Sequence, residues 1–151
     1  MKQEVWIKHK VHQVAAKFGT SDPFKICDKS GIQLRYDDLG SLVLGYHAVV
    51  KRIPTIVLST RNTDLENRFV CAHELGHHFC HHSANAEWMT RSQLSKLAIG
   101  DEYQANVFMS CLFVEGIDLS NALTKQEVLY SSSLPAWAER YVPWDLIKRG
   151  K

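Results

Sequence analysis

Five of the eight histidines fall within residues 71–82, CAHELGHHFCHH. Here His73, Glu74 and His77 form the pattern H-E-x-x-H. Residues i and i+4 of a helix share one face, so the two imidazoles can bind one ion at about 2.0–2.1 Å. Bound zinc lowers the pKa of its water to about 7, which makes hydrolysis possible at neutral pH. The pattern therefore predicts a hydrolytic metal site.

Glu74 has a different expected role from the two histidines. It follows the first of them and is offset by about 100° around the helix, so it borders the metal without binding it. There it can take a proton from the metal-bound water and pass it to a leaving amine. The alternative is a solvated, histidine-rich helix surface, because a bare H-E-x-x-H also arises by chance.

The third metal ligand should come from another element. His81 lies eight residues after His73, about 12 Å along a helix axis, too far for one straight helix to place both around an ion. Downstream, Glu102 and Asn106 in EYQAN stand at i and i+4. Glu102 would bind the metal, and Asn106 would accept the ring N–H of a ligand histidine. Two histidines and one carboxylate leave one position open, as in catalytic zinc sites.

Other assignments of these residues stay open. Asp101 and Glu87 are weaker candidates for the third ligand, and Glu102 could simply be an acid favoured in the first turn of a helix. Zinc is the first choice for this ligand set, although other divalent ions bind such sites. His78 has no assigned role and His82 is expected in solvent. His81 is expected to support a ligand or to cap the end of the helix.

The elements that must position these residues can be read from periodicity and caps. Thr63 and Glu66 form a capping box, so the motif helix should begin at Asp64. Apolar, β-branched runs predict a small sheet of about three strands at 32–36, 41–50 and 55–59. Helical spacing and capping signals predict further helices near 3–18, 23–30, 101–113 and 125–130. The expected fold is α+β, a small sheet packed against the motif helix with several further helices.

Composition narrows the class of protein. The chain has 151 residues, a formal charge of +2 and interleaved acidic and basic residues, so no direct nucleic-acid binding is expected. The charged N-terminus does not resemble a signal peptide and no apolar run could span a membrane, so we expect a cytoplasmic protein with free thiols. The length is typical of one domain, which is expected over residues 1–151.

Aromatic residues supply the remaining candidates. Tyr46, His47 and Tyr103 are positional candidates for stabilising an oxyanion, with ordinary packing or surface exposure as the alternative. Three more aromatic residues mark the C-terminal segment, namely Trp137, Tyr141 and Trp144. They are expected to cover the last helices or, alternatively, to form a partner surface. An edge strand, at 42–47 or 55–59, would hold an extended substrate unless both strands are internal.

Two segments of the chain together resemble a known family. RFVCAHELGHHFCHH followed by DEYQANVFMSCLF is similar to the ImmA/IrrE metallopeptidases, in which an AHELGH helix precedes an E-x-E-A-N-x-F-A helix. The resemblance covers about residues 11–115. It implies one metallopeptidase domain over 1–151, with a core at about 11–115 and a helical extension at about 116–151. It implies a zincin-like fold, with His73, His77 and Glu102 as ligands and Glu74 as general base. Gln104 stands where the family usually has a second glutamate.

The resemblance also implies a substrate class. Members of that family cleave helix-turn-helix repressors, often those of phages or mobile elements, so a protein substrate cut at one site is expected. A second hypothesis is a non-proteolytic regulator that binds a repressor or antitoxin-like partner and uses the metal as a brace. A hydrolase acting on a small molecule is a third, and a deep closed pocket would favour it.

Overall fold

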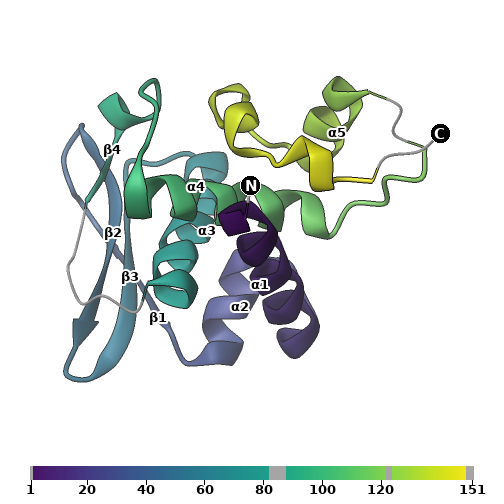
Figure 1. Cartoon of the computed structure of the whole chain (residues 1–151). Helices are drawn as coiled ribbons and strands as arrows, with labels where there is room; N and C mark the ends of the chain where they lie inside the picture. The colour runs from purple at the N-terminus through teal and green to yellow at the C-terminus, as the bar shows by residue number, and fades with distance from the viewer. Residues whose placement is uncertain (1, 82–87, 122–123, 149–151) are drawn as a thin grey trace.

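The computed structural model describes residues 2–81, 88–121 and 124–148. One sheet forms one side of the molecule, and helices pack against it (Figure 1). This arrangement confirms the expected α+β, zincin-like class. The elements are α1 (Lys2–Phe18), α2 (Pro23–Ser30), β1 (Gln33–Asp37), β2 (Val43–Val50), β3 (Ile53–Ser59), α3 (Asp64–Cys80), β4 (Met89–Thr90), α4 (Gly100–Glu115) and α5 (Lys125–Ser132), with short 3₁₀ turns η1 (Arg91–Gln93), η2 (Ala136–Tyr141) and η3 (Trp144–Leu146).

The sheet has the strand order β1-β3-β2-β4, so it has four strands rather than about three. β1 runs parallel to β3, and β2 is antiparallel to both β3 and β4. The two-residue β4 is too short to show a period of two in the sequence. Residues 55–59 of β3 are buried throughout, as expected for a central strand. The suggestion that this run is a substrate-binding edge is therefore wrong.

Two predicted helix starts are confirmed. In α2, the Asp22 carboxylate accepts from the backbone N–H of Phe24, and Pro23 occupies the first turn. In α3, Thr63 and Glu66 exchange side-chain and backbone hydrogen bonds of 2.9 and 3.1 Å. These caps satisfy amides that the first helical turn leaves without intrahelical partners. The start of α3 is thereby fixed, which sets the position of every residue in the motif.

Helices α3 and α4 approach each other closely at Gly76. A Cβ atom at this position would lie 2.9 Å from the Ala105 Cα atom and 3.1 Å from the Phe108 Cβ atom. Real side chains do not tolerate the first of these distances, so the contact requires glycine. The close approach brings residues of the motif helix within reach of side chains at the start of α4.

The C-terminal segment packs on α4, at the upper right of Figure 1. Tyr141 is 2% exposed and belongs to the main core, while Trp137 and Trp144 are partly buried against it. The aromatic residues therefore cover the last helices, which was the first of the two interpretations. Three of the cysteines are buried, Cys80 is half-buried, and all four are free.

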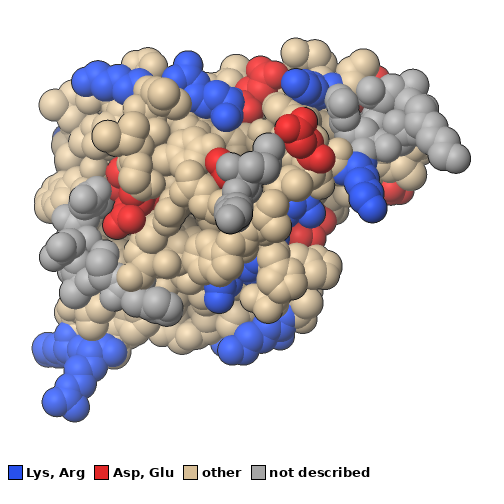
Figure 2. Space-filling model, viewed as in Figure 1, with Lys and Arg blue, Asp and Glu red and all other residues tan. Residues whose placement is uncertain are grey.

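The face of the molecule in Figure 2 carries charges of both signs. Basic and acidic side chains are interspersed over the face in Figure 2 instead of forming one basic area. Within the described ranges, every helix is too short or too polar to cross a lipid bilayer.

Candidate metal centre

Three potential ligands converge between α3 and α4. His73 and His77 project from the middle of α3, and Glu102 projects from the first turn of α4. Their ligand atoms all lie within 4.8 Å of one another. The Nε2 atoms of His73 and His77 each lie 2.9 Å from a different oxygen of the Glu102 carboxylate. This is the only such group of three or more potential ligands in the part of the chain that the structure describes.

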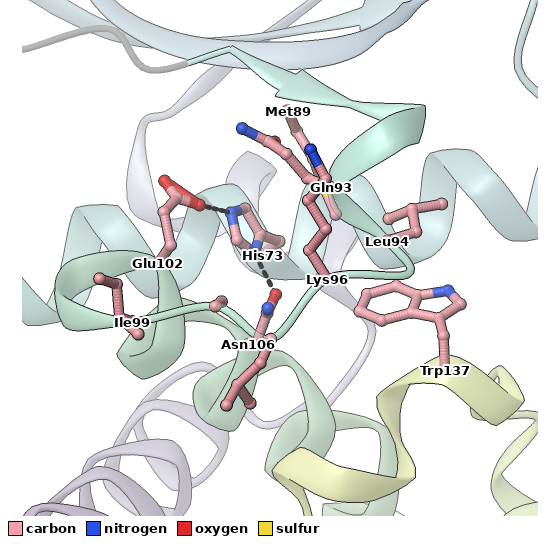
Figure 3. Close-up of a pocket in the computed structure, with 11 residues that line it drawn as sticks. His73, Met89, Gln93, Leu94, Lys96, Ile99, Glu102, Asn106 and Trp137 are labelled. Atoms are coloured by element: carbon pink, nitrogen blue, oxygen red, sulfur yellow. Dashed lines mark hydrogen bonds and ion pairs between the residues drawn. The ribbon is translucent and has the colours of Figure 1, made fainter.

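His73 is oriented by a buried hydrogen bond. Its Nδ1 atom lies 2.7 Å from the Asn106 Oδ1 atom, as Figure 3 shows. An amide oxygen only accepts, so the Nδ1 atom must carry the hydrogen. In a neutral ring, Nε2 then presents its lone pair to the Glu102 carboxylate. Two lone pairs at 2.9 Å repel each other unless a proton or a metal ion lies between them.

His77 is oriented by a longer chain of bonds. The Gln104 Oε1 atom can only accept, so the His81 Nε2 atom, 2.6 Å away, carries a hydrogen. In a neutral His81, Nδ1 then accepts from the His77 Nδ1 atom, 3.2 Å away. The chain continues from the Gln104 amide nitrogen to the Gln3 Oε1 atom at 3.0 Å. His81 was weighed as a support for a ligand, and it makes the contact that this role requires.

The Nε2 atom of His77 tests whether a metal fits. It is buried and makes no well-formed hydrogen bond to any described residue, although Glu102 lies beside it. A buried polar atom without a hydrogen bond is rare and calls for an explanation such as a missing ion. Two imidazole nitrogens and a carboxylate form the His₂Glu set of catalytic zinc sites. The residues therefore fit a divalent metal.

The electrostatics agree with this geometry. Burial alone would raise the pKa of Glu102, but hydrogen bonds and charge attraction from the His73 and His77 rings, when their Nε2 atoms carry protons, outweigh it and hold that pKa far below its ordinary value. Glu102 is therefore a carboxylate at neutral pH, the form that binds a cation. Burial, and then the proximity of His77 and His78, lowers the pKa of His47 to about 4. The His47 ring is therefore neutral at pH 7.

Glu74 lies beside the cluster and is 1% exposed. One of its carboxylate oxygens is 3.9 Å from the Nε2 atom of His73. Glu74 is not among the three residues whose ligand atoms converge, but its carboxylate is close enough to border a molecule bound at the centre. This is the position expected from its offset around the helix.

Comparisons with known proteins agree with the geometry. The family model described as the IrrE N-terminal-like domain matches residues 27–141. Metallopeptidase ImmA of Bacillus subtilis (strain 168) is 30% identical over 142 residues, which cover 89% of this chain and 82% of that protein. The chain belongs to the IrrE N-terminal-like family. This family membership, together with the His-His-Glu cluster, indicates a metal-dependent peptidase.

A phage relative extends the family comparison. An uncharacterized immunity region protein 2 of Bacillus phage phi105 is 32% identical over 104 residues. The match covers 68% of this chain but 64% of the phage protein, so the chain spans just under two thirds of that relative. No solved structure gives a significant match.

The oxyanion candidates occupy three different surroundings. Tyr46 stacks on Trp88 with ring centroids 4.8 Å apart. The Tyr103 hydroxyl donates to Glu4 at 2.8 Å, which directs it toward α1. His47 is buried, and its ring is nearly parallel to that of His77 with the centroids 6.5 Å apart. Of these three side chains, only His47 has a ring contact with a described residue of the cluster, namely His77.

Asp101, one of the two alternative third ligands, is not part of the cluster. The Asp101 side chain is 63% exposed, and one of its oxygens lies 3.6 Å from the His81 Nε2 atom. Glu87 and His82 lie outside the described residues.

Met109–Phe113, the MSCLF segment, is buried, and four of its residues belong to the hydrophobic core.

Proposed function

We propose that this protein is a zinc-dependent endopeptidase that cleaves a helix-turn-helix transcriptional repressor. The observation that carries the proposal is the convergence of two histidines and a carboxylate beside a second, buried carboxylate in a member of the IrrE N-terminal-like family. We further propose that residues 1–151 act as one metallopeptidase domain, with a core at about 11–115 and a helical extension at about 116–151.

Three residues would hold the metal. The Nε2 atoms of His73 and His77 and the Glu102 carboxylate supply two nitrogen donors and one oxygen donor, for which zinc is well suited. When bound, the ion supplies Lewis acidity, which polarises a carbonyl group and makes a water molecule acidic. Asn106 and His81 keep the two rings oriented through their Nδ1 hydrogens. Such outer partners fix the tautomer that presents Nε2 to the metal.

Glu74 would move the proton. A carboxylate at this position accepts a proton from the attacking water and donates it to the nitrogen of the leaving amine. Its burial keeps bulk water away, and its carboxylate lies 3.9 Å from the ring that it must work beside. The reaction consumes one water molecule and breaks one peptide bond, and the general base is regenerated at the end.

The relatives support the choice of substrate. One relative is named an immunity region protein of a phage, and another is a metallopeptidase named ImmA. We propose a repressor of a phage or mobile element, encoded near this gene, as the protein substrate. Such a substrate places the enzyme in the cytoplasm.

The test separates proteolysis from simple binding. Purified zinc-loaded protein is incubated with the neighbouring helix-turn-helix repressor, and cleavage is followed by mass spectrometry. Glu74→Gln should retain zinc but cleave at least about 100-fold more slowly, the range expected when general acid–base catalysis is lost. Glu115→Gln makes the same chemical change at the other end of α4 and should leave the rate unchanged.

Two results would contradict the proposal. Unchanged cleavage by Glu74→Gln would remove Glu74 from the mechanism. Stable binding of the intact repressor by wild type and Glu74→Gln alike would instead favour the non-proteolytic regulator, in which the metal is only a brace. His73→Ala should then abolish binding together with zinc retention.

A further inference from the structure

A cavity of about 220 Å³ opens beside the metal centre. Figure 3 shows residues that line it. His73, Glu102 and Asn106 line it on one side, and the rest of its wall comes from residues 89–99 and Trp137. We propose that this cavity binds one large apolar side chain of the substrate, next to the bond that is cut. The inference rests on the proposed function, and it defines which peptide sequence the enzyme selects.

The wall of the cavity is mainly apolar. Its apolar members are Met89, Leu94, Leu97, Ala98, Ile99 and Trp137. Leu97 and Ile99 are 63% and 80% exposed, so the apolar lining continues to the surface. Small-molecule sites typically combine such a lining with a few polar groups that fix orientation. Here the polar groups are Gln93, Lys96 and the residues of the metal centre.

Size and charge restrict the occupant. A cavity of about 150 Å³ lined by aliphatic and aromatic side chains binds benzene, so this one has room for Leu, Met or Phe. A basic side chain would be repelled by Lys96, and the Glu102 carboxylate in the wall would already be shared with the metal. An acidic side chain that pairs with Lys96 is the one competing occupant.

The far wall is held in place before any substrate binds. The Tyr141 hydroxyl accepts from the Ala98 backbone N–H at 3.0 Å and donates to the Lys96 carbonyl oxygen at 3.3 Å. Tyr141 is itself buried, and its ring contacts that of Trp137 at 6.3 Å between centroids. The C-terminal segment therefore fixes the loop that shapes the cavity. A preformed wall improves selectivity because little order must be created on binding.

Three hydroxamates that share the metal-binding group and differ in the attached chain test the proposal. Acetohydroxamate probes the metal alone, 4-methylpentanohydroxamate adds a branched apolar chain, and succinic monohydroxamate adds a carboxylate. Calorimetry with the zinc-loaded full chain should show the branched compound binding about 10- to 100-fold more tightly than acetohydroxamate, the gain from burying a Leu-sized group. Succinic monohydroxamate should show no such gain.

Two matched variants test whether the gain in affinity for the branched compound comes from the cavity. Leu97→Glu should reduce the ratio between the branched compound and acetohydroxamate at least about threefold, because it places a charge at the mouth of the cavity. Leu42→Glu replaces a leucine of similar exposure, 69%, that does not line the cavity, and it should preserve the ratio.

The outcomes separate this inference from the proposed function. Equal affinity for all three hydroxamates would overturn the apolar pocket and leave the metal centre intact. Tighter binding of succinic monohydroxamate would overturn it in favour of an acidic side chain. No binding of any compound by zinc-loaded protein would overturn both the open metal position that the proposed hydrolysis requires and the pocket beside it.

Discussion

The two histidines of the centre lie one helical turn apart, yet they are held in different ways. His73 depends on one bond to Asn106, whose side chain is buried and lines the inner wall of the cavity. His77 depends on a chain through His81 and Gln104 that ends at the exposed Gln3. Water can replace a lost partner near the surface but not in the interior. We call His73 with Asn106 the inner half of the centre, and His77 with His81 and Gln104 the outer half. Zinc binding should therefore tolerate the loss of a partner less well in the inner half.

The largest loss of zinc affinity is expected for Glu102, which lies beside both histidines. Glu102 contacts both rings, so Glu102→Gln removes the shared anionic donor. Zinc affinity, measured by competition with a chromogenic chelator, should fall by more than the roughly 10- to 100-fold typical of outer partners. Glu115→Gln is the control on the same helix. An affinity within threefold of wild type would exclude Glu102 as a ligand.

Asn106→Leu tests the inner half. It leaves the His73 Nδ1–H buried without an acceptor and frees the ring to rotate. Zinc affinity should fall by about 100-fold, the upper end for loss of an outer partner. Circular dichroism of the metal-free variant checks that the fold persists. Rescue by Asn106→Asp, which restores an acceptor, would separate positioning from packing.

His81→Ala tests the outer half. The substitution removes the acceptor of the His77 Nδ1–H but opens a path for water to take its place. The same chelator assay should show a loss of about tenfold, the lower end of the range. A loss as large as that of Asn106→Leu would show that the two halves are equally dependent on their partners.

Gln3→Ala should have the smallest effect. Gln3 is exposed and closes the chain of bonds at its far end, so water can bond to the Gln104 amide instead. Zinc affinity should stay within about twofold of wild type, as for most surface substitutions. A tenfold loss would mean that the bond chain acts as one unit from Gln3 to His77.

The same contrast shows what one sequence can and cannot reveal. The start of α3, the H-E-x-x-H pattern and the i, i+4 pair of Glu102 and Asn106 depend on local periodicity and capping, which a sequence displays directly. Their convergence was expected, and the structure brings all four site side chains together with Glu74 beside them. Their roles as ligands and base remain predictions.

The missed features all depend on distant partners. Gln104 and Gln3 are 101 residues apart, and the Tyr141 hydroxyl meets a backbone 43 residues away. Such pairs follow from how helices cross and where the C-terminal segment lies, which periodicity does not specify. The misplaced substrate edge at 55–59 has a similar cause. A continuous apolar run indicates burial on both faces but not which strands flank it.

The contact at Gly76 has a consequence for ion selection. Since the space between the two helices there is too narrow even for a Cβ atom, α4 has little room to move closer to α3 around a smaller ion. The spacing between the helices that carry the histidine pair and Glu102 is therefore set by packing outside the metal centre. An ion bound at the centre must suit this spacing between α3 and α4, which depends on the absence of a side chain at Gly76.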